Sequence, residues 1–278
     1  MEKEITAALI YDFDGTLSPG NMQEYDFIPT VGKSNAEFWE ESNRIAAAHD
    51  ADPILAYLYK MLQFANEKQM PIKRERLVES GRNVQLYDGV KEWFGRMNEY
   101  AAERGIKLLH YINSSGLREI IEGTSIAHEF KNIFACSFLY NEQGEATWPG
   151  VALNYTNKTQ FLYKINKGVE SVSDSKLVNS YVPDEDRFIR FEHMIYIGDG
   201  KTDIPCMRLV RFRGGHSIAV YQPDSKVHEA NAKLMCRQGR SNFACPADYT
   251  EGSCIDTVVK TIIDKIYIDN RLKQLAGE

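Results

Sequence analysis

The stretch Ala7-Ala8-Leu9-Ile10-Tyr11-Asp12-Phe13-Asp14-Gly15-Thr16 decides the fold of this chain. A short, nearly continuous apolar run is typical of a strand that is buried on both faces, as the central strands of a parallel sheet are. Two acids and a glycine follow the run directly, so the strand ends there. The stretch therefore predicts a buried first strand whose end carries two carboxylates.

Similar apolar runs recur later in the chain, and a helical pattern follows each of them. The runs are residues 107–112, 193–197 and 217–221, and the helical patterns begin near residues 117, 204 and 226. Strands that alternate with helices indicate βαβ crossovers. We therefore expect an α/β fold with a doubly wound, Rossmann-like parallel sheet.

The segment between the first two predicted strands has a different pattern. Residues 33–104 have apolar positions at helical spacing and contain no strand candidate. Ser34 precedes Glu37 at the spacing of a capping box, and Pro53 stands near the start of a second helix. We therefore predict an all-helical cap subdomain over residues 21–105, inserted into a core domain that comprises residues 1–20 and 106–278.

Three further segments complete the predicted organisation. Residues 137–146 read as a hairpin with its turn at residues 141–144. Residues 168–190 are polar, and we expect a surface loop or a short helix there. Apolar residues at a spacing of three to four predict a closing amphipathic helix around residues 255–266.

Composition excludes several classes of protein. The chain has 278 residues, a net charge of −6 and a pI of about 5.6, so a nucleic-acid partner is not expected. No window approaches the roughly 20 apolar residues of a membrane span, and the start of the chain lacks the pattern of a signal peptide. Five cysteines without a Cys-x-x-Cys pair favour neither a disulfide framework nor structural zinc. We expect a cytoplasmic globular protein with no membrane partner, and the sequence leaves its oligomeric state open.

Polar residues follow the predicted strands where each strand ends. Asp12, Asp14, Ser114 and Asp199 hold such positions, and Lys158 opens a predicted helix. Ligands of open α/β sheets bind outside the carboxyl ends of the strands. Neighbouring carboxylates ionise together readily only beside a cation, and oxygen ligands without histidine or cysteine favour Mg²⁺ over zinc.

Some of these positions have plainer or competing interpretations. Asp12 and Asp14 could form a turn after the strand. Asp203 could cap the helix that contains Pro205, or it could contact the metal indirectly or brace the loop. Ser115 competes with Ser114 for a phosphate, because either serine could face the ligand. Lys158 has two rivals further along its helix, Lys164 and Lys167. Aromatic residues of the cap, Phe38, Trp39, Tyr57 and Tyr59, are expected to serve helix packing more than a substrate pocket.

The motifs resemble those of the haloacid dehalogenase-like hydrolase superfamily, in the same order along the chain. Residues 12–17 resemble its first motif, residues 111–114 its second, Lys158 its third and residues 198–203 its fourth. The hairpin and the residues after Ser114 look most like the phosphoserine phosphatase-like branch, and the helical insert is similar to its C1 cap.

The resemblance implies a mechanism as well as a fold. Asp12 would be the nucleophile that becomes an aspartyl-phosphate, and Asp14 would act as general acid and base. Mg²⁺ would be held by the Asp12 carboxylate, the backbone carbonyl of Asp14 and Asp199. Ser114 and Lys158 would bind the phosphate.

We therefore predict a Mg²⁺-dependent phosphatase that acts on a small phosphorylated metabolite. The alternatives are a phosphotransferase or mutase of the same superfamily, a non-hydrolytic receiver-like domain, and a catalytically idle binding protein. The residues just after the first motif, Asn21, Gln23, Glu24 and Tyr25, are the candidates for contacting the leaving group. The substrate itself has no signature in the sequence.

Overall fold

A computed structural model describes residues 5–276 of the chain. Residues 1–4, on which part of the signal-peptide expectation rests, lie outside the described residues, as do residues 277 and 278. The strands are β1 (Ile5–Tyr11), β2 (Ile106–Leu117), β3 (Asn132–Tyr140), β4 (Ala146–Val151), β5 (Met194–Gly198), β6 (His216–Tyr221) and β7 (Phe243–Pro246). They form one sheet in the order β4-β3-β2-β1-β5-β6-β7.

Strand β1 is the centre of the sheet, as its apolar run predicts. It pairs in parallel with β2 on one side and with β5 on the other, and Ala7 to Tyr11 are fully buried. All other neighbours in the sheet are parallel except β3 and β4, which form the predicted antiparallel hairpin. The prediction of a doubly wound, mostly parallel sheet is therefore confirmed. Strand β7 was not predicted, because four residues without an apolar run give too weak a signal.

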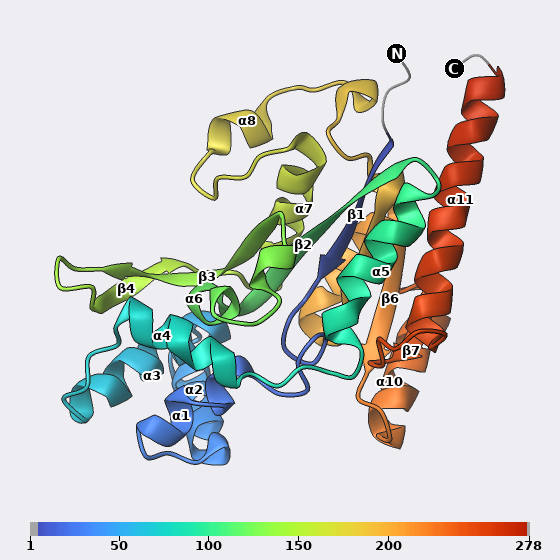
Figure 1. Ribbon diagram of the computed structural model, residues 1–278. Helices are drawn as coiled ribbons and strands as arrows, with labels where there is room; N and C mark the ends of the chain where they lie inside the picture. The colour runs from blue at the N-terminus through green and yellow to red at the C-terminus, as the bar shows by residue number, and fades with distance from the viewer. Residues whose placement is uncertain (1–4, 277–278) are drawn as a thin grey trace.

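Helices cover both faces of this sheet (Figure 1). They are α1 (Phe27–Thr30), α2 (Asn35–Ala48), α3 (Pro53–Glu67), α4 (Arg74–Ser80), α5 (Val90–Ala102), α6 (Arg118–Glu122), α7 (Lys158–Lys167), α8 (Ser175–Asn179), α9 (Ile204–Phe212), α10 (Lys226–Arg237) and α11 (Cys254–Ala276). Helix α5 packs with α11, and α7 packs with α9. Because β1–α5–β2 and β5–α9–β6 run in opposite directions across the sheet, right-handed crossovers place these two pairs of helices on opposite faces.

The helices α1–α4 lie together at one end of the sheet, beside the β3–β4 hairpin (Figure 1). Ser34 and Glu37 form the expected capping box at the start of α2, and Asp52 caps α3 just before Pro53. Helix α5 packs against the centre of the sheet: the Trp93 indole N–H donates to the Tyr11 hydroxyl of β1 at 2.8 Å, and the Phe94 ring meets that of Tyr11 edge to face. We propose that the cap subdomain ends before α5 rather than at residue 105.

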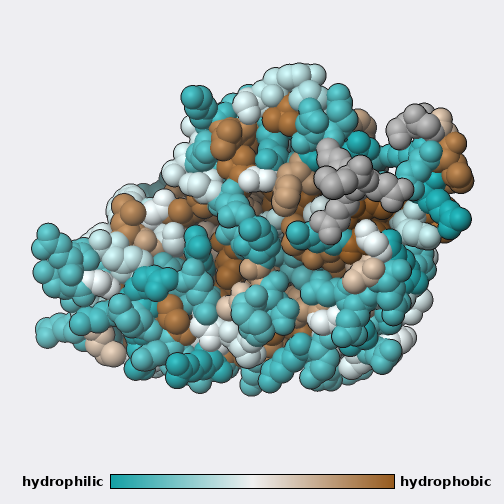
Figure 2. Space-filling view, turned by 45° about the horizontal axis from the view of Figure 1, so that its top comes forward, coloured by the Kyte–Doolittle hydropathy of each residue, from teal (hydrophilic) through white to brown (hydrophobic). Residues whose placement is uncertain are grey.

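The remaining segments agree with their expected character. Residues 168–190 contain the short helix α8 and surface turns, and α11 is the closing amphipathic helix. None of the helices in residues 5–276 is both long enough and apolar enough to cross a membrane. The face of the molecule in Figure 2 is covered mostly by hydrophilic residues.

Candidate active site

A cavity of about 360 Å³ lies at the carboxyl ends of β1, β2 and β5. It is lined by four of the predicted site residues, Asp12, Asp14, Ser114 and Asp199, and by residues of the helical segment between β1 and α5. These residues come together because the parallel strands β2, β1 and β5 are neighbours and end at one edge of the sheet. We call this space the catalytic cavity.

Lys158 lies directly behind Asp12. Its ammonium Nζ is 3.2 Å from Asp12 Oδ1 and 2.8 Å from Asp203 Oδ1, and its side chain is fully buried. Helix α7 begins at Lys158, so the first residue of the helix reaches back to the strand ends, as the sequence predicts. The backbone N–H of Asp12 donates to Ile197 O at 2.9 Å, which holds Asp12 against the end of β5.

Asp203 holds Lys158 in place and does not cap the helix that follows. Its side chain makes no capping bond to α9. Instead Oδ1 accepts hydrogen bonds from Lys158 and from the Tyr196 hydroxyl, both at 2.8 Å, and Oδ2 accepts one from the Gly200 N–H at 3.2 Å. Gly198 leaves room for this arrangement, because a Cβ there would lie 2.6 Å from Asp203 Cγ.

The carboxylate of Asp14 is oriented by Met22. The Met22 N–H donates to Asp14 Oδ1 at 2.9 Å, and the Leu117 N–H donates to Met22 Sδ at 3.1 Å. Met22 therefore connects the end of β1 to the end of β2. Gly116 permits the close approach, since a Cβ at that position would lie 2.1 Å from Met22 Cε.

Gly15 explains why glycine follows the two acids. Its φ of +72° lies in the left-handed region, where a side chain is strained. A Cβ on Gly15 would also lie only 2.3 Å from Asp199 Oδ2. The glycine thus allows the end of β1 to turn while the Asp199 carboxylate lies against it.

Both candidate serines line the catalytic cavity. Ser114 is buried, and its Oγ accepts a hydrogen bond from the Gly116 N–H at 3.1 Å. Ser115 Oγ is buried without a hydrogen-bond partner among the described residues, while the Ser115 carbonyl accepts the Tyr57 hydroxyl at 2.7 Å. Ser114 as the phosphate ligand stays a prediction.

The two rival lysines on α7 lie away from the cavity. Lys164 donates to the backbone carbonyls of Ser171 and Asp174, and Lys167 donates to those of Val178 and Ser180. These four bonds fasten residues 171–180 to α7. Lys158 is therefore the lysine of α7 that contacts Asp12.

Burial and mutual repulsion disfavour the charged forms of the acids. Burial, together with the negative charge of Asp203, raises the pKa of Asp12 to about 6 even though Lys158 counteracts it. Burial and the charge of Asp12 raise the pKa of Asp14 well above its usual value. Burial alone would lower the pKa of Lys158, but the charges of Asp12 and Asp203 raise it by more than burial lowers it. The pKa of Lys158 is therefore above its usual value, and this lysine is a stable cation.

The acids fit a divalent cation. One carboxylate oxygen each of Asp12, Asp199 and Asp203 lie within 4.8 Å of one another. Asp12 Oδ1 is buried and has Lys158 Nζ at 3.2 Å as its ion-pair partner, and the Asp12 carboxylate also lines the cavity. Both oxygens of Asp203 already accept hydrogen bonds, which leaves Asp12 and Asp199 as the more available ligands. A set of oxygen donors without histidine or cysteine suits Mg²⁺.

The helical segment supplies the opposite wall of the catalytic cavity. We define this cap wall as Asn21, Gln23, Trp39, Ile54 and Tyr57. Trp39 and Tyr57 meet with ring centroids 5.8 Å apart at an interplanar angle of 66°. These two aromatic residues therefore both pack against each other and line the cavity, whereas Phe38 is a fully buried core residue, as the packing interpretation predicts.

Glu24 lies behind this wall and orients it. Its Oε1 accepts hydrogen bonds from the Trp39 indole N–H at 2.7 Å and from the Asn21 amide at 2.6 Å. Glu24 is therefore close to the site, as the sequence predicts, although it does not itself line the cavity. Tyr25 donates no bond into the site; its hydroxyl accepts one from Ser18 Oγ at 3.3 Å.

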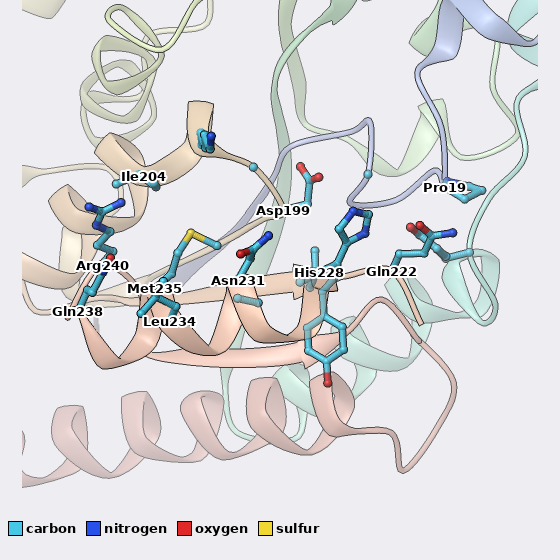
Figure 3. Close-up of a pocket in the computed structure, with 17 residues that line it drawn as sticks. Pro19, Asp199, Ile204, Gln222, His228, Asn231, Leu234, Met235, Gln238 and Arg240 are labelled. Atoms are coloured by element: carbon cyan, nitrogen blue, oxygen red, sulfur yellow. The ribbon is translucent and has the colours of Figure 1, made fainter. Parts of the chain in front are cut away.

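A second cavity, of about 390 Å³, adjoins the catalytic cavity on the far side of Asp199. The two share Gly15, Pro19 and Asp199 in their walls. Figure 3 shows Asp199 above this second space, with His228, Asn231 and Met235 of α10 extending toward it from below. Neither Ser114 nor any residue of the cap wall lines it.

The sequence did not single out Tyr196 or Met22, both of which orient site residues. Tyr196 stands inside an apolar strand, and a buried tyrosine hydroxyl usually needs a partner, which was an available signal. Met22 carries no such signal. Its role comes from its backbone N–H, which nearly every residue has, and from its thioether, and a methionine at an apolar position is not in itself unusual.

Comparison with known proteins agrees with this geometry. Residues 9–208 match the family model of haloacid dehalogenase-like hydrolases. An uncharacterized protein of Borreliella burgdorferi is 27% identical over 281 residues, which cover 91% of this chain and 94% of that protein. The chain belongs to the haloacid dehalogenase-like hydrolase family.

Solved structures share its fold at low sequence identity. A family hydrolase from Salmonella enterica serovar Typhi superposes with a TM-score of 0.57 at 14% identity, covering 92% of this chain and 70% of that one. A substrate-bound phosphoserine phosphatase superposes with a TM-score of 0.54, also at 14% identity, covering 87% of this chain and 93% of the other. The expected α/β fold with a cap over the strand ends is therefore shared with phosphoserine phosphatases.

Proposed function

We propose that this protein is a Mg²⁺-dependent phosphatase that hydrolyses a small phosphorylated metabolite through an aspartyl-phosphate on Asp12. One observation carries the proposal: Asp12 and Asp14 line one cavity with Ser114, while the buried ammonium of Lys158 lies 3.2 Å from the Asp12 carboxylate. The fold relationship to phosphoserine phosphatases supports phosphate-ester chemistry on this scaffold.

Asp12 is the proposed nucleophile because its carboxylate lines the cavity and its position is fixed. Its backbone is held to β5, and Lys158 lies beside Oδ1. The carboxylate attacks phosphorus, the bond to the leaving oxygen breaks, and the phosphoryl group is transferred to Asp12. Its two anionic neighbours keep Lys158 charged, and this cation beside Asp12 stabilises the negative charge of the group that is transferred to Asp12.

Asp14 is the proposed general acid and base. Its raised pKa supplies a protonated carboxyl that can donate to the leaving alcohol, and the resulting carboxylate then accepts a proton from the hydrolytic water. The bond from the Met22 N–H holds one oxygen of Asp14, so the other remains available for proton transfer. The second acid two residues after the nucleophile also favours phosphate-ester hydrolysis over dehalogenation within this family.

The proposed ligands of Mg²⁺ are the carboxylates of Asp12 and Asp199 and the backbone carbonyl of Asp14. A bound Mg²⁺ would offset the negative charge between the nucleophile and the phosphate. Asp203 is proposed to position Lys158, since both of its oxygens are already occupied by hydrogen bonds. The five free cysteines support a reducing, cytoplasmic compartment.

The test is hydrolysis of p-nitrophenyl phosphate by the purified protein. We expect turnover that requires Mg²⁺, stops with excess chelator and is lost in Asp12→Asn. Full activity in Asp12→Asn or in excess chelator would refute the nucleophile or the metal, respectively.

The same assay distinguishes hydrolysis from transfer to another acceptor. A hydrolase releases one inorganic phosphate for each nitrophenol formed. A phosphotransferase or mutase releases less phosphate than nitrophenol when an acceptor alcohol is present. A receiver-like or idle binding protein shows no turnover.

A further inference from the structure

We infer that the catalytic cavity accepts phosphate esters of neutral or ammonium-bearing alcohols and rejects those whose alcohol carries an acid group. This inference rests on the proposed function and extends it to the class of the leaving group. It depends on the charges and partners of the cap wall, which faces the reacting phosphate.

The cavity wall, as far as the described residues form it, has no cationic side chain for an acidic leaving group. Among the described residues that line it, three are aspartates and none is lysine or arginine. The neighbouring cation, Lys158, is fully buried behind Asp12 and already contacts two carboxylates. The proposed Mg²⁺ would lie with Asp12 and Asp199 at the phosphate, so a carboxylate or a second phosphate on the leaving group would meet the cap wall without a cationic partner, which costs binding free energy.

Glu24 adds to this bias. Its carboxylate lies behind the cap wall, where it accepts hydrogen bonds from Trp39 and Asn21. A second anion near these two residues would be repelled by Glu24, whereas a hydroxyl or an ammonium would not.

The cap wall instead offers acceptors and aromatic faces. Gln23 is 2% exposed, and its Oε1 has no hydrogen-bond partner among the described residues. A donor on the ligand would satisfy such an acceptor. The rings of Trp39 and Tyr57 line the same cavity, and aromatic faces attract ammonium groups.

The second cavity does not supply the missing cation. Lys201, His228 and Arg240 line that cavity, but it lies across Asp199 from the cap wall. The Asp199 carboxylate lies against Gly15, where even a Cβ would come within 2.3 Å of Oδ2. None of those three side chains lines the catalytic cavity, so a leaving group held within that cavity does not meet them.

Two pairs of substrates isolate the acid group. O-phosphoethanolamine and O-phosphoserine differ by one carboxylate, and glycerol 3-phosphate and 3-phosphoglycerate differ chiefly in the same way. Each compound is measured as a substrate and as a competitor of p-nitrophenyl phosphate hydrolysis. We expect the member without the acid to be favoured about 10-fold or more in kcat/KM or in inhibition constant, the effect of leaving one charge unpaired.

A cation introduced into the wall should reverse this preference. Ile54 lines the cavity, so Ile54→Arg is expected to improve the acidic member of each pair about 10-fold relative to its partner. The matched control is Leu55→Arg at the adjacent position of α3, which is 43% exposed and does not line the cavity. This control should leave both ratios unchanged.

The outcomes separate this inference from the proposed function. An enzyme that hydrolyses p-nitrophenyl phosphate but binds both members of each pair equally, or favours the acidic one, overturns the inference alone. Equal ratios in Ile54→Arg and Leu55→Arg overturn it as well. A protein that hydrolyses none of the five esters overturns the proposed function, and the inference with it.

Discussion

Replacement of Lys158 by methionine tests the centre of the site most directly. The side chain is fully buried, and its ammonium contacts Asp203 at 2.8 Å and Asp12 at 3.2 Å. Methionine has a similar length and fills the same space, so the change removes the charge with little change in packing. The variant leaves two buried carboxylates without their cation.

The expected loss of stability follows from these distances. At an effective dielectric constant of about 20, the two contacts correspond to gross attractions of about 6 and about 5 kcal/mol. The cost of burying the ammonium offsets much of this sum, but in the variant the two carboxylates no longer have their cation. Breaking a buried pair from one side costs about 3–5 kcal/mol, and we expect Lys158→Met to lower the free energy of unfolding by that amount at pH 8.

The pH dependence has a definite sign. The folded-state pKa of Asp12 is already raised to about 6, and loss of Lys158 raises it further. A carboxyl with a raised pKa destabilises the fold above that pKa, and this cost disappears as the pH falls toward the unfolded value near 4. The difference between variant and wild type should therefore shrink between pH 8 and pH 4.

Urea denaturation followed by circular dichroism, with chelator present, measures these differences. Asp203→Asn in the Lys158→Met background removes one stranded anion, so the double variant should lose less stability than the sum of the single losses. Lys201→Met is the control, because Lys201 is exposed, and it should change stability by no more than about 0.5 kcal/mol. If the stability losses of the two single variants were additive, or if Lys158→Met lost less than about 1 kcal/mol, the buried ion pairs of Lys158 with Asp12 and Asp203 would be contradicted. In the activity assay, Lys158→Met should also lower kcat about 10²–10³-fold.

Three further predictions address the acids, the turn and the cap. Asp14→Asn should slow turnover about 10²–10⁴-fold while phosphate stays covalently attached in acid-quenched protein; rapid turnover would remove Asp14 from proton transfer. Gly15→Ala should displace Asp199, which lowers activity about 10²-fold and raises the Mg²⁺ concentration that the enzyme needs. The control is Gly95→Ala, which should change neither, because no atom lies near its Cβ. Equal activities of the two variants would contradict the role of Gly15 in the turn after β1. Glu41 has its pKa lowered to about 2 by hydrogen bonds from two lysines, so it stabilises the fold above about pH 4.5, and this contribution fades as the pH falls toward 2. In urea denaturation, Glu41→Gln should therefore lower the free energy of unfolding by about 0.5–1 kcal/mol at pH 7 and by less at pH 3. A decrease that does not depend on pH would show that the two lysines do not stabilise the fold through Glu41.

The cap also separates catalysis from selection. In the proposed function, the core residues Asp12, Asp14, Ser114 and Lys158 would act on the phosphate, which every substrate shares. The cap wall would act on the alcohol, which differs between substrates. Substitutions such as Ile54→Arg should therefore alter which ester is preferred without removing hydrolysis of p-nitrophenyl phosphate.

The local patterns of the sequence were sufficient to predict the framework. An apolar run such as residues 7–11 is stable only where both faces are covered, so it identifies a central strand without reference to any partner. The capping box at Ser34 and the proline after Asp52 likewise act within one turn of chain. For the same reason the acids at the end of β1 were predicted to lie at the binding edge of the sheet.

The roles that depend on distant contacts were decided only by the tertiary structure. The sequence left the role of Asp203 open between a helix cap and a bracing residue, because its partners Lys158 and Tyr196 lie on other elements. Trp39 and Tyr57 looked like packing residues, because which side of a helix faces a cavity depends on where that helix sits over the strand ends. Periodicity and capping come from neighbours along the chain, whereas the charge, the partners and the shape of a cavity come from groups that folding brings together from far apart in the sequence.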